Sequence, residues 1–350
     1  MVVLRTRNFV LWLLIVAIFF VLFFPLFISD RTADTLSYNN EEQNDFVTQP
    51  VDLPTEILFT GDIMLGRDVE RRNQASDLVN ALTIFSNFLE YDAVVINLEG
   101  PVPDRHVPTP DFGFQFSIRS SFMPLLKSAG VTHVGLANNH TYDHGRLGYE
   151  QTLTNVLGAD LVPFGHPSVL DNNSVTYIDT EHGRIAVVGI HTLFRVPTQQ
   201  SVDSLFTEVS DNADFVVVYI HWGEEYELEQ NNIQRQLAES LVAAGADVII
   251  GHHPHVVQGI ELVSGVPVIY SIGNTIFDQY FSQDVQEGLL VSLELTNDTQ
   301  RLILHPITSI GTPTHPRKME GGEQVRFLQD LATRSSSVLS DEIMAGVISW

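Results

Sequence analysis

From residue 56 onward, short apolar runs rich in β-branched residues alternate with segments whose apolar residues recur at helical spacing. The first pattern is typical of buried strands and the second of amphipathic helices. Strands are predicted at residues 56–61, 93–99, 131–136, 184–190, 214–220, 247–251 and 267–271. Helices are predicted near residues 75–89, 121–129, 146–157, 229–244 and 323–332. This alternation predicts an α/β domain with largely parallel strands.

Two apolar segments near the end of the chain follow a different pattern. Residues 288–295 and 301–307 lie only a few positions apart, which is typical of an antiparallel hairpin. The sheet is therefore predicted to be mixed. We expect the α/β domain to cover residues 55–312 and a helical extension to cover residues 313–350.

The N-terminal region has the pattern of a membrane anchor. Residues 9–28 carry no charge, and a bilayer core needs ~20 such residues. Arg5 and Arg7 precede this stretch, so the positive-inside rule places residues 1–8 in the cytoplasm and the main domain outside. The apolar part exceeds the ~7–15 residues of a cleavable signal, and no small-residue cleavage pattern follows it. We predict a retained single-pass anchor in the cell membrane, with a cleaved signal as the alternative, and a flexible stalk at residues 29–54.

Side chains that bind metals follow several of the predicted strands directly. In chain order they are Asp62; Asn97 and Glu99; Asn139 and His140, with Asp143 and His144 just after; His221 and Glu224; His252, His253 and His255; and Asn274. Ligands of open α/β sheets gather at the carboxyl ends of the strands. We therefore expect these side chains to meet at one rim of the sheet. Gly61, Gly100 and Gly251, which stand beside them, permit tight turns and close approach of the backbone.

Composition narrows the chemistry. The chain has no cysteine, which excludes disulfides, thiolate metal sites and cysteine nucleophiles. Its formal net charge of -25 opposes binding to nucleic acid. Carboxylates, imidazoles and an amide without thiolates suit Mn, Fe or Zn. The candidates outnumber the ligands of one ion, and a pair of cations roughly 3.5–4 Å apart would use them in phosphoester hydrolysis.

Six segments also resemble a known family. GDIMLGR, VINLEGPV, GLANNHTYDHG, VYIHWGEEYE, IIGHHPHVVQGIE and VIYSIGNTIFDQ are similar, in this order, to the motifs of CapA/PgsA-like capsule and poly-γ-glutamate biosynthesis proteins. These proteins have the calcineurin-like metallophosphatase fold. The resemblance implies an αββα sandwich with mixed, largely parallel sheets. It also implies an anchored protein that faces outward.

The resemblance implies roles for individual residues. The implied metal ligands are Asp62, Glu99, Asn139, His221, His253 and His255. His140 is implied to lie near the scissile phosphate as a catalytic residue. Asn97 is the less favoured alternative to Glu99 as the bridging ligand, and His252 is left as a packing or outer residue. Met64 stands where the superfamily has a histidine, and Asn-Leu-Glu replaces its usual Gly-Asp.

Other polar residues near the motifs have two interpretations each. Arg67 neutralises a bound anion as a catalytic cation, or it pairs with a nearby carboxylate. Asp143 is a loop former or an outer residue, and His144 and Asn274 are outer or substrate-contacting candidates. Glu224 is favoured over its neighbour Glu225 as the residue that reaches the site. The remaining histidines have no motif partner and are interpreted as structural or surface residues, and they are His106, His133, His166, His182, His191, His305 and His315.

These observations leave three functions open. The first is an anchored protein that assists synthesis or export of an anionic polymer, with membrane synthase subunits as partners. The second is a general extracytoplasmic metal-dependent phosphoesterase or other hydrolase. The third is a non-catalytic module that holds a polymer in the same cleft, which the methionine at position 64 favours.

Overall fold

The computed structural model describes residues 53–73, 75–110 and 112–350. The predicted cytoplasmic end and membrane anchor, and all but the last two residues of the predicted stalk, lie outside the described residues. Among the helices that are described, none is long and apolar enough to cross a bilayer.

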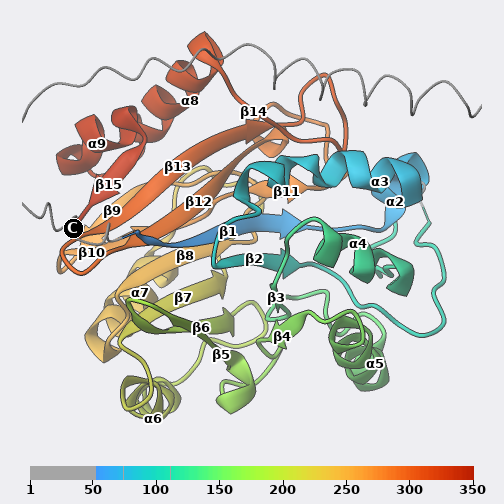
Figure 1. Ribbon diagram of the computed structural model, residues 1–350, viewed down its shortest axis with the longest axis horizontal. Helices are drawn as coiled ribbons and strands as arrows, with labels where there is room; N and C mark the ends of the chain where they lie inside the picture. The colour runs from blue at the N-terminus through green and yellow to red at the C-terminus, as the bar shows by residue number, and fades with distance from the viewer. Residues whose placement is uncertain (1–52, 74, 111) are drawn as a thin grey trace, which may run out of the picture. The chain divides into compact units, whose positions relative to one another are not determined.

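The larger of two β-sheets has nine strands (Figure 1). Its order is β14-β13-β12-β1-β2-β3-β4, with β11 beside β1 and β15 beside β13. The strands are β1 (Thr55–Ile63), β2 (Ala93–Leu98), β3 (His133–Gly135), β4 (Val162–Phe164), β11 (Asn274–Ile276), β12 (Glu287–Leu295), β13 (Gln300–Thr308), β14 (Arg317–Lys318) and β15 (Val347–Ser349).

The smaller sheet has six strands in the order β5-β6-β7-β8-β10-β9. They are β5 (Val175–Thr180), β6 (Gly183–His191), β7 (Phe215–His221), β8 (Val248–His252), β9 (Ile260–Val263) and β10 (Val266–Ile269). In the larger sheet, β11, β1, β2, β3 and β4 pair in parallel, and in the smaller sheet β6, β7, β8 and β10 do so. The mixed sheets are confirmed. "Largely parallel" is wrong for the strands from β12 to β15 and for β5 and β9, which pair antiparallel, several of them through hairpins such as β12–β13 and β9–β10.

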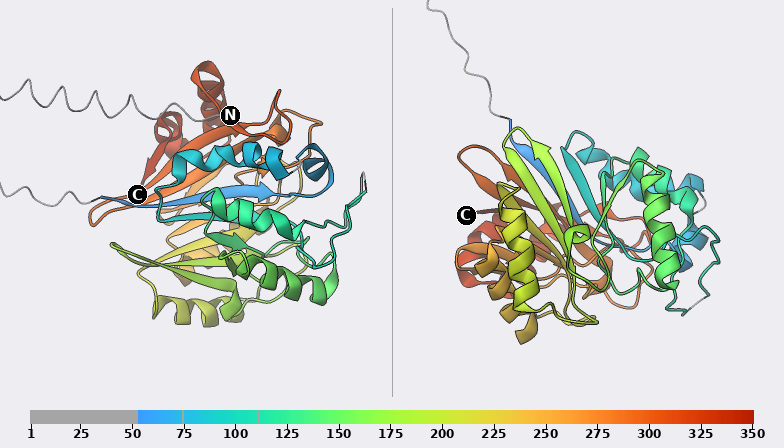
Figure 2. Two further views of the ribbon diagram at one scale, coloured as in Figure 1. Left: turned by 45° about the vertical axis from the view of Figure 1, so that its right-hand side comes forward. Right: turned by 90° about the horizontal axis from the view of Figure 1, so that it is seen from below.

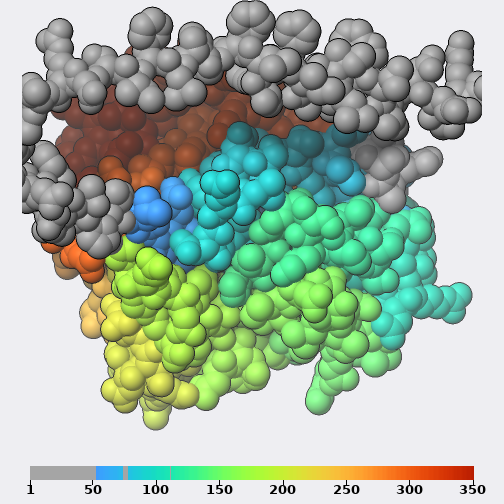
Figure 3. Space-filling model, viewed as in Figure 1, coloured from blue at the N-terminus to red at the C-terminus, as the bar shows by residue number. Residues whose placement is uncertain are grey.

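Helices cover the outer faces of both sheets and one side of the core between them (Figures 1 and 2). They are α2 (Arg67–Arg72), α3 (Ala75–Ala81), α4 (Met123–Ser128), α5 (Gly145–Leu157), α6 (Gln199–Ser210), α7 (Asn232–Ala244), α8 (Gly321–Thr333) and α9 (Ser340–Ala345). Helices α2 to α5 pack on the larger sheet and α6 and α7 on the smaller one. The segments from α3 to α5 form much of the surface on this face (Figure 3), and their buried residues pack against β2 and β3.

Alternation along the central strands explains this layering. Ile57 and Phe59 of β1 face the core between the two sheets, whereas Leu58 faces the helices. Val217 and Ile250 of the smaller sheet share the inner core. Both faces of each sheet are covered, so the strands are continuous apolar runs in the sequence. The αββα sandwich is confirmed.

Most predicted elements are present, with some differences in detail. The helix predicted at 75–89 is α-helical only as far as the end of α3. A 3-10 segment, Leu82–Phe88, follows it. That segment contains the β-branched residues Thr83 and Ile84, which favour a regular α-helix less. Helix α6 was not predicted, although its buried residues Val202, Leu205, Phe206 and Val209 have helical spacing.

Candidate metal centre

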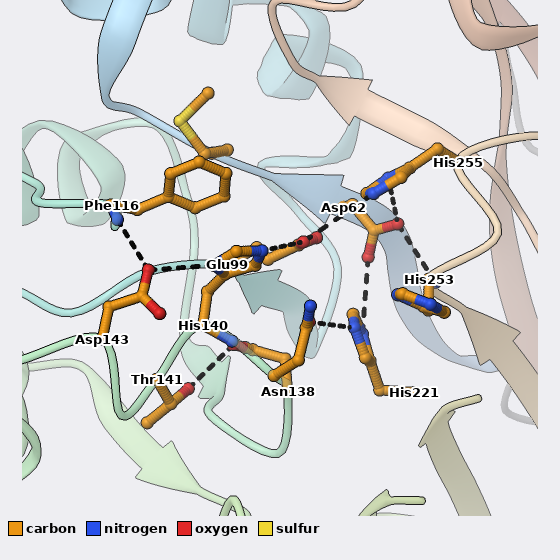
Figure 4. A network of polar contacts seen from close by, with 12 residues as sticks. Asp62, Glu99, Phe116, Asn138, His140, Thr141, Asp143, His221, His253 and His255 are labelled. Carbon is orange, nitrogen blue, oxygen red and sulfur yellow. Dashed lines mark hydrogen bonds and ion pairs between the residues drawn. The ribbon is translucent and has the colours of Figure 1, made fainter. Parts of the chain in front are cut away.

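The centre lies at the carboxyl ends of parallel strands from both sheets (Figure 4). Asp62 and Asn97 lie on β1 and β2 of the larger sheet, and His221 and His252 end β7 and β8 of the smaller sheet. The prediction of a single rim is therefore wrong in one respect. The side chains meet across the seam between two rims, because the chain divides its strands between two facing sheets.

Glycines allow the backbone to pass closely behind the centre. A Cβ on Gly61 would lie 1.8 Å from the carbonyl oxygen of Gly273, and one on Gly251 would lie 2.1 Å from that of Tyr270. No side chain fits at either distance. The pairing of β1 with β2 also shifts register between Phe59 and Asp62. Such irregularities re-aim side chains at the end of a strand.

Asp62 is the most connected residue of the centre. Its side chain is fully buried, and its Oδ1 accepts a hydrogen bond from Asn97 Nδ2 at 2.7 Å. His252 Nδ1 lies 3.5 Å from Oδ1, and His255 Nδ1 lies 3.2 Å from Oδ2. Burial raises the pKa of Asp62, but hydrogen bonds and charge from these two histidines hold it well below its ordinary value. Asp62 is therefore a buried carboxylate that stays ionised.

Glu99 follows β2 and is also fully buried, but it is not hydrogen-bonded. Neither of its carboxylate oxygens has a partner among the described residues. The nearest imidazole nitrogens are His140 Nε2 at 3.8 Å and His255 Nε2 at 3.9 Å from Oε1. Burial, reinforced by the negative charge of Asp62, raises the pKa of Glu99 well above its ordinary value. A buried carboxylate with two unpartnered oxygens suits a bound cation.

Three asparagines form hydrogen bonds near these acids. Asn138 Nδ2 donates to Asn97 Oδ1 at 3.0 Å, and Asn138 Oδ1 accepts from the backbone N–H of His140. Asn139 Oδ1 lies 2.8 Å from His221 Nε2. Asn138 was not among the predicted site residues. The signal available in the sequence was its position, directly before Asn139 in the same motif.

The histidines come from the smaller sheet and the loop after it. His253 and His255 have φ of 99° and 59°, a region that non-glycine residues rarely adopt. Such strain persists at sites where the surroundings hold it in place. His253 Nδ1 and His252 Nε2 are buried without a hydrogen-bond partner among the described residues. Burial lowers the pKa of His253 to about 3 and that of His221 well below its ordinary value, so both rings are neutral, which is the metal-binding form.

The donor atoms form three overlapping groups. They are Asp62 with His221 and His252, Asp62 with Glu99 and His255, and Glu225 with His253 and His255. Within each group the ligand atoms lie within 4.8 Å of one another. Because Asp62 and His255 each belong to two groups, the arrangement fits two neighbouring divalent cations better than one. The unpartnered atoms of Glu99, His252 and His253 support the same fit.

The structure groups two residues differently from the sequence interpretation. His252 was left outside the ligand set, yet its Nδ1 lies beside Asp62 and only 2.7 Å from His221 Nδ1. Glu225 lies with His253 and His255, whereas Glu224 lines a separate cavity with Trp222 and belongs to none of the donor groups. Both glutamates are exposed, and the sequence has no local signal for which of them lies beside the histidines.

His140 is held by contacts on two sides. Its Nδ1 lies 2.9 Å from Asp143 Oδ2, which also accepts the backbone N–H of Phe116. The Phe116 ring stacks on the imidazole at 3.9 Å between centroids. Asp143 accepts from Nδ1–H, so the Nε2 of His140 faces Glu99 and the centre.

Arg67, Asn274 and His144 occupy three different positions around the centre. Arg67 forms a two-pronged ion pair with Asp278 and lies over the Phe116 ring, so its charge is neutralised by a carboxylate. Asn274 Oδ1 lies 2.9 Å from His255 Nδ1 and orients that ring. His144 precedes α5 and belongs to none of the donor groups.

Met64 is fully buried, and its sulfur accepts a hydrogen bond from Gly66 N–H at 3.0 Å. A thioether is a poor ligand for the hard and borderline cations that carboxylates and imidazoles favour. This position of the superfamily pattern therefore contributes no oxygen or nitrogen ligand here.

Comparison with known proteins identifies relatives. The model of a family described as "Bacterial capsule synthesis protein PGA_cap" matches residues 56–279. A protein of Bacillus subtilis strain 168 named "PGA biosynthesis protein CapA" is 31% identical over 299 residues, covering 79% of this chain and 78% of the relative. "Capsule biosynthesis protein CapA" of Bacillus anthracis is 31% identical over 277 residues, covering 71% of this chain and 66% of the relative.

Solved structures with a similar fold are more distant. A phosphatase from Mycoplasma pneumoniae has 15% sequence identity and a TM-score of 0.46, covering 73% of this chain and 94% of that one. A putative 5'-nucleotidase from Staphylococcus aureus has 18% identity and a TM-score of 0.45, covering 71% of this chain and 52% of that one.

Proposed function

This chain belongs to the bacterial capsule synthesis protein family, and on that premise we propose that it assists the synthesis or export of a capsule polymer of the poly-γ-glutamate type through a metal-dependent hydrolytic site. The reaction class is phosphoester-type hydrolysis. The proposal also includes a membrane anchor at residues 9–28, with the main domain outside the cell and membrane synthase subunits as partners.

The buried donor set at the seam of the two sheets is the observation that carries this proposal. Two carboxylates, Asp62 and Glu99, lie fully buried beside imidazoles that burial keeps neutral. Such a cluster without a cation leaves the oxygens of Glu99 desolvated and unpartnered, which is costly. Bound cations would remove that cost and would offset the acidity of the chain locally.

The residues that would hold two divalent cations are Asp62, Glu99, His221, His252, His253 and His255, with Glu225 at the outer edge and Asn139 beside His221. Divalent cations supply Lewis-acid chemistry for hydrolysis at such a site. Mn, Fe and Zn all suit this donor set.

His140 is suited to move a proton at the reacting centre. Its Nδ1–H is held by Asp143, so its Nε2 presents either a lone pair or a proton toward the centre, according to the charge of the ring. Stacking on Phe116 restricts rotation of the ring. As an imidazolium, His140 would donate its Nε2 proton to a leaving group and would become the neutral ring whose Nδ1–H Asp143 holds.

Metal titration of the full chain tests the proposal. After treatment with a chelator, Mn²⁺ is returned and bound metal is measured by mass spectrometry, together with hydrolysis of a generic aryl phosphodiester. We expect two equivalents of metal and metal-dependent turnover. Asp62→Asn should reduce turnover by at least about a thousandfold, because it removes a carboxylate shared by two donor groups.

Asp179→Asn is the matched control, since Asp179 is exposed and, among the described residues, its side chain pairs with Arg184 alone. It should bind and hydrolyse like the unmodified chain. Turnover that survives Asp62→Asn would rule out a hydrolytic centre here. Bound metal without any turnover would favour the non-catalytic polymer-holding function, for which Met64 in place of a histidine is the supporting observation.

A further inference from the structure

A cavity of about 230 Å³ lies beside the metal centre, at the carboxyl end of β6. The residues that line it are Ser168, Val169, Leu170, Ile190, His191, Arg195, Pro197, Thr198 and Ser201. None of them belongs to the six family motifs or to the donor groups of the centre. Two of the polar side chains have hydrogen-bonding capacity that the protein itself leaves unused.

Arg195 is the cation of this cavity. In the part of the chain that the structure describes, it has neither an ion pair nor a hydrogen bond. This is unexpected in a chain with 18 basic and 43 acidic residues, where carboxylates are abundant. The N-terminus of α6, which Thr198 caps, lies at the same cavity and adds to the positive potential. The cavity therefore favours an anionic group.

His191 supplies a hydrogen-bond acceptor to the cavity. It is 8% exposed, and its Nδ1 lies 2.7 Å from the carbonyl oxygen of Pro167. A carbonyl only accepts, so Nδ1 carries the proton and the Nε2 of the neutral ring is an acceptor. That Nε2 has no partner among the described residues. Phe194 packs edge-on against the ring, with 4.8 Å between centroids, and restricts its rotation.

A metal ion does not fit these two groups. A cation would lie beside the guanidinium of Arg195, and among the described residues no carboxylate lines the cavity to offset the repulsion. A simple anion leaves the acceptor Nε2 of His191 unsatisfied. The pair instead matches a ligand that carries both a negative charge and an N–H donor.

We propose that this cavity binds one unit of an amide-linked chain that bears a free carboxylate, with the carboxylate on Arg195 and the amide N–H donated to His191 Nε2. Poly-γ-glutamate has this chemistry in every unit, and for the identity of the polymer the inference rests on the proposed function. His191 pairs with His221 in the register of β6 and β7, and the two rings are 5.7 Å apart. The cavity is thus a subsite one strand away from the metal centre, where it positions the chain for the reaction.

Binding measured without metal tests the subsite separately from hydrolysis. The probe is an N-acetylated γ-linked glutamate pentamer, titrated calorimetrically into the full chain after chelator treatment. The same pentamer with its carboxylates converted to amides, and inorganic phosphate, are the comparison ligands. Arg195→Gln should weaken binding of the pentamer by about tenfold or more, because a charge-assisted hydrogen bond is lost. His191→Phe, which keeps an aromatic ring but removes the acceptor, should weaken it by about threefold to tenfold.

Arg146→Gln is the matched control, because Arg146 is an exposed arginine on α5 whose one ion-pair partner within residues 53–73, 75–110 and 112–350 is Glu150. It changes the net charge by the same amount and should leave the affinity unchanged. Arg195→Lys should recover part of the affinity, and thermal unfolding should show all variants to be folded.

Three outcomes would overturn the subsite. They are equal affinities for Arg195→Gln and Arg146→Gln, phosphate binding as tightly as the pentamer, and pentamer binding that disappears when metal is removed. The outcome that supports it is Arg195-dependent, metal-independent binding of the pentamer but not of its amide form. Loss of hydrolysis alone would count against the proposed function and leave this inference standing.

Discussion

Two groups of buried or half-buried histidines in this protein differ in whether their ring nitrogens have hydrogen-bond partners. His133 and His305 lie within the larger sheet, and each has a hydroxyl partner at 2.8 Å, Thr132 for the first and Ser292 for the second. His252 and His253 of the metal centre are at least as buried, yet each has a nitrogen without a partner.

Burial alone therefore does not distinguish a site from a core. Burial lowers the pKa of His133, His305 and His253 alike, to about 4 for the first two and about 3 for the third. The difference is that His133 and His305 have hydroxyl partners, whereas His252, His253 and Glu99 of the metal centre have buried atoms without a hydrogen-bond partner among the described residues. Native proteins pair nearly all buried polar groups, so a cluster of unpaired nitrogens and carboxylate oxygens indicates a ligand.

Of the three predictions that test this comparison, the one with the largest expected effect concerns His305 in the larger sheet and the pH dependence of stability. The folded pKa of His305 is about 4, below its ordinary value of 6.5. The unfolded chain therefore binds more protons between these values, and stability falls as the pH is lowered through this window. We expect His305 alone to cost about 2 kcal/mol of unfolding free energy between about pH 7.5 and about pH 5.

Urea unfolding at both pH values measures this cost. His305→Gln does not titrate and retains a group that can bond to Ser292, so its stability should depend less on pH by that amount. Its metal content should equal that of the unmodified chain. An unchanged pH dependence would show that His305 is not held neutral. The comparison between His305 and the histidines of the metal centre would then fail.

The second effect concerns how the centre orients its histidines. Asp143→Ala removes the acceptor of His140 Nδ1–H, so the ring loses its fixed tautomer. Loss of such an outer partner reduces activity by about tenfold or more. We expect this loss in the turnover number of the Mn²⁺ form, with bound metal unchanged.

Asp143→Asn provides a control for the role of Asp143. One oxygen, Oδ2, accepts from both His140 and Phe116, and an amide oxygen can take its place. Most of the activity should therefore return. A loss of metal in Asp143→Ala would mean that Asp143 supports the donor groups themselves rather than the proton-transfer residue.

The smallest effect concerns the solvent-exposed edge of the metal centre, where Glu225 lies beside His253 and His255. Glu225→Gln removes an exposed carboxylate from the group with His253 and His255 and should lower Mn²⁺ affinity by about threefold. Glu224→Gln removes the same charge from the neighbouring residue and should have no effect. Calorimetric titration with Mn²⁺ distinguishes the two, and equal effects would mean that only the overall charge matters at this edge.

The sequence alone determined the elements and the donor inventory. Apolar runs predicted the central strands, because a strand that is buried on both faces is a nearly continuous apolar run in the sequence. The absence of cysteine and the positions of Asp62, Glu99, His221 and His253 after these runs predicted an oxygen and nitrogen centre. The ordered motifs predicted the family, which comparison with relatives confirms.

Only the tertiary structure decided which strands belong to which of the two sheets and which side chains come together. The assignment of β1 and β7 to different sheets depends on packing between segments more than a hundred residues apart, for which no local pattern exists. The same holds for the ion pair of Arg67 with Asp278 and for the position of Glu225 beside His253 and His255. Local periodicity reports which face of a segment is buried, whereas the choice of partner is a long-range packing decision. The sequence therefore specifies the ligands, and the two sheets together specify the site.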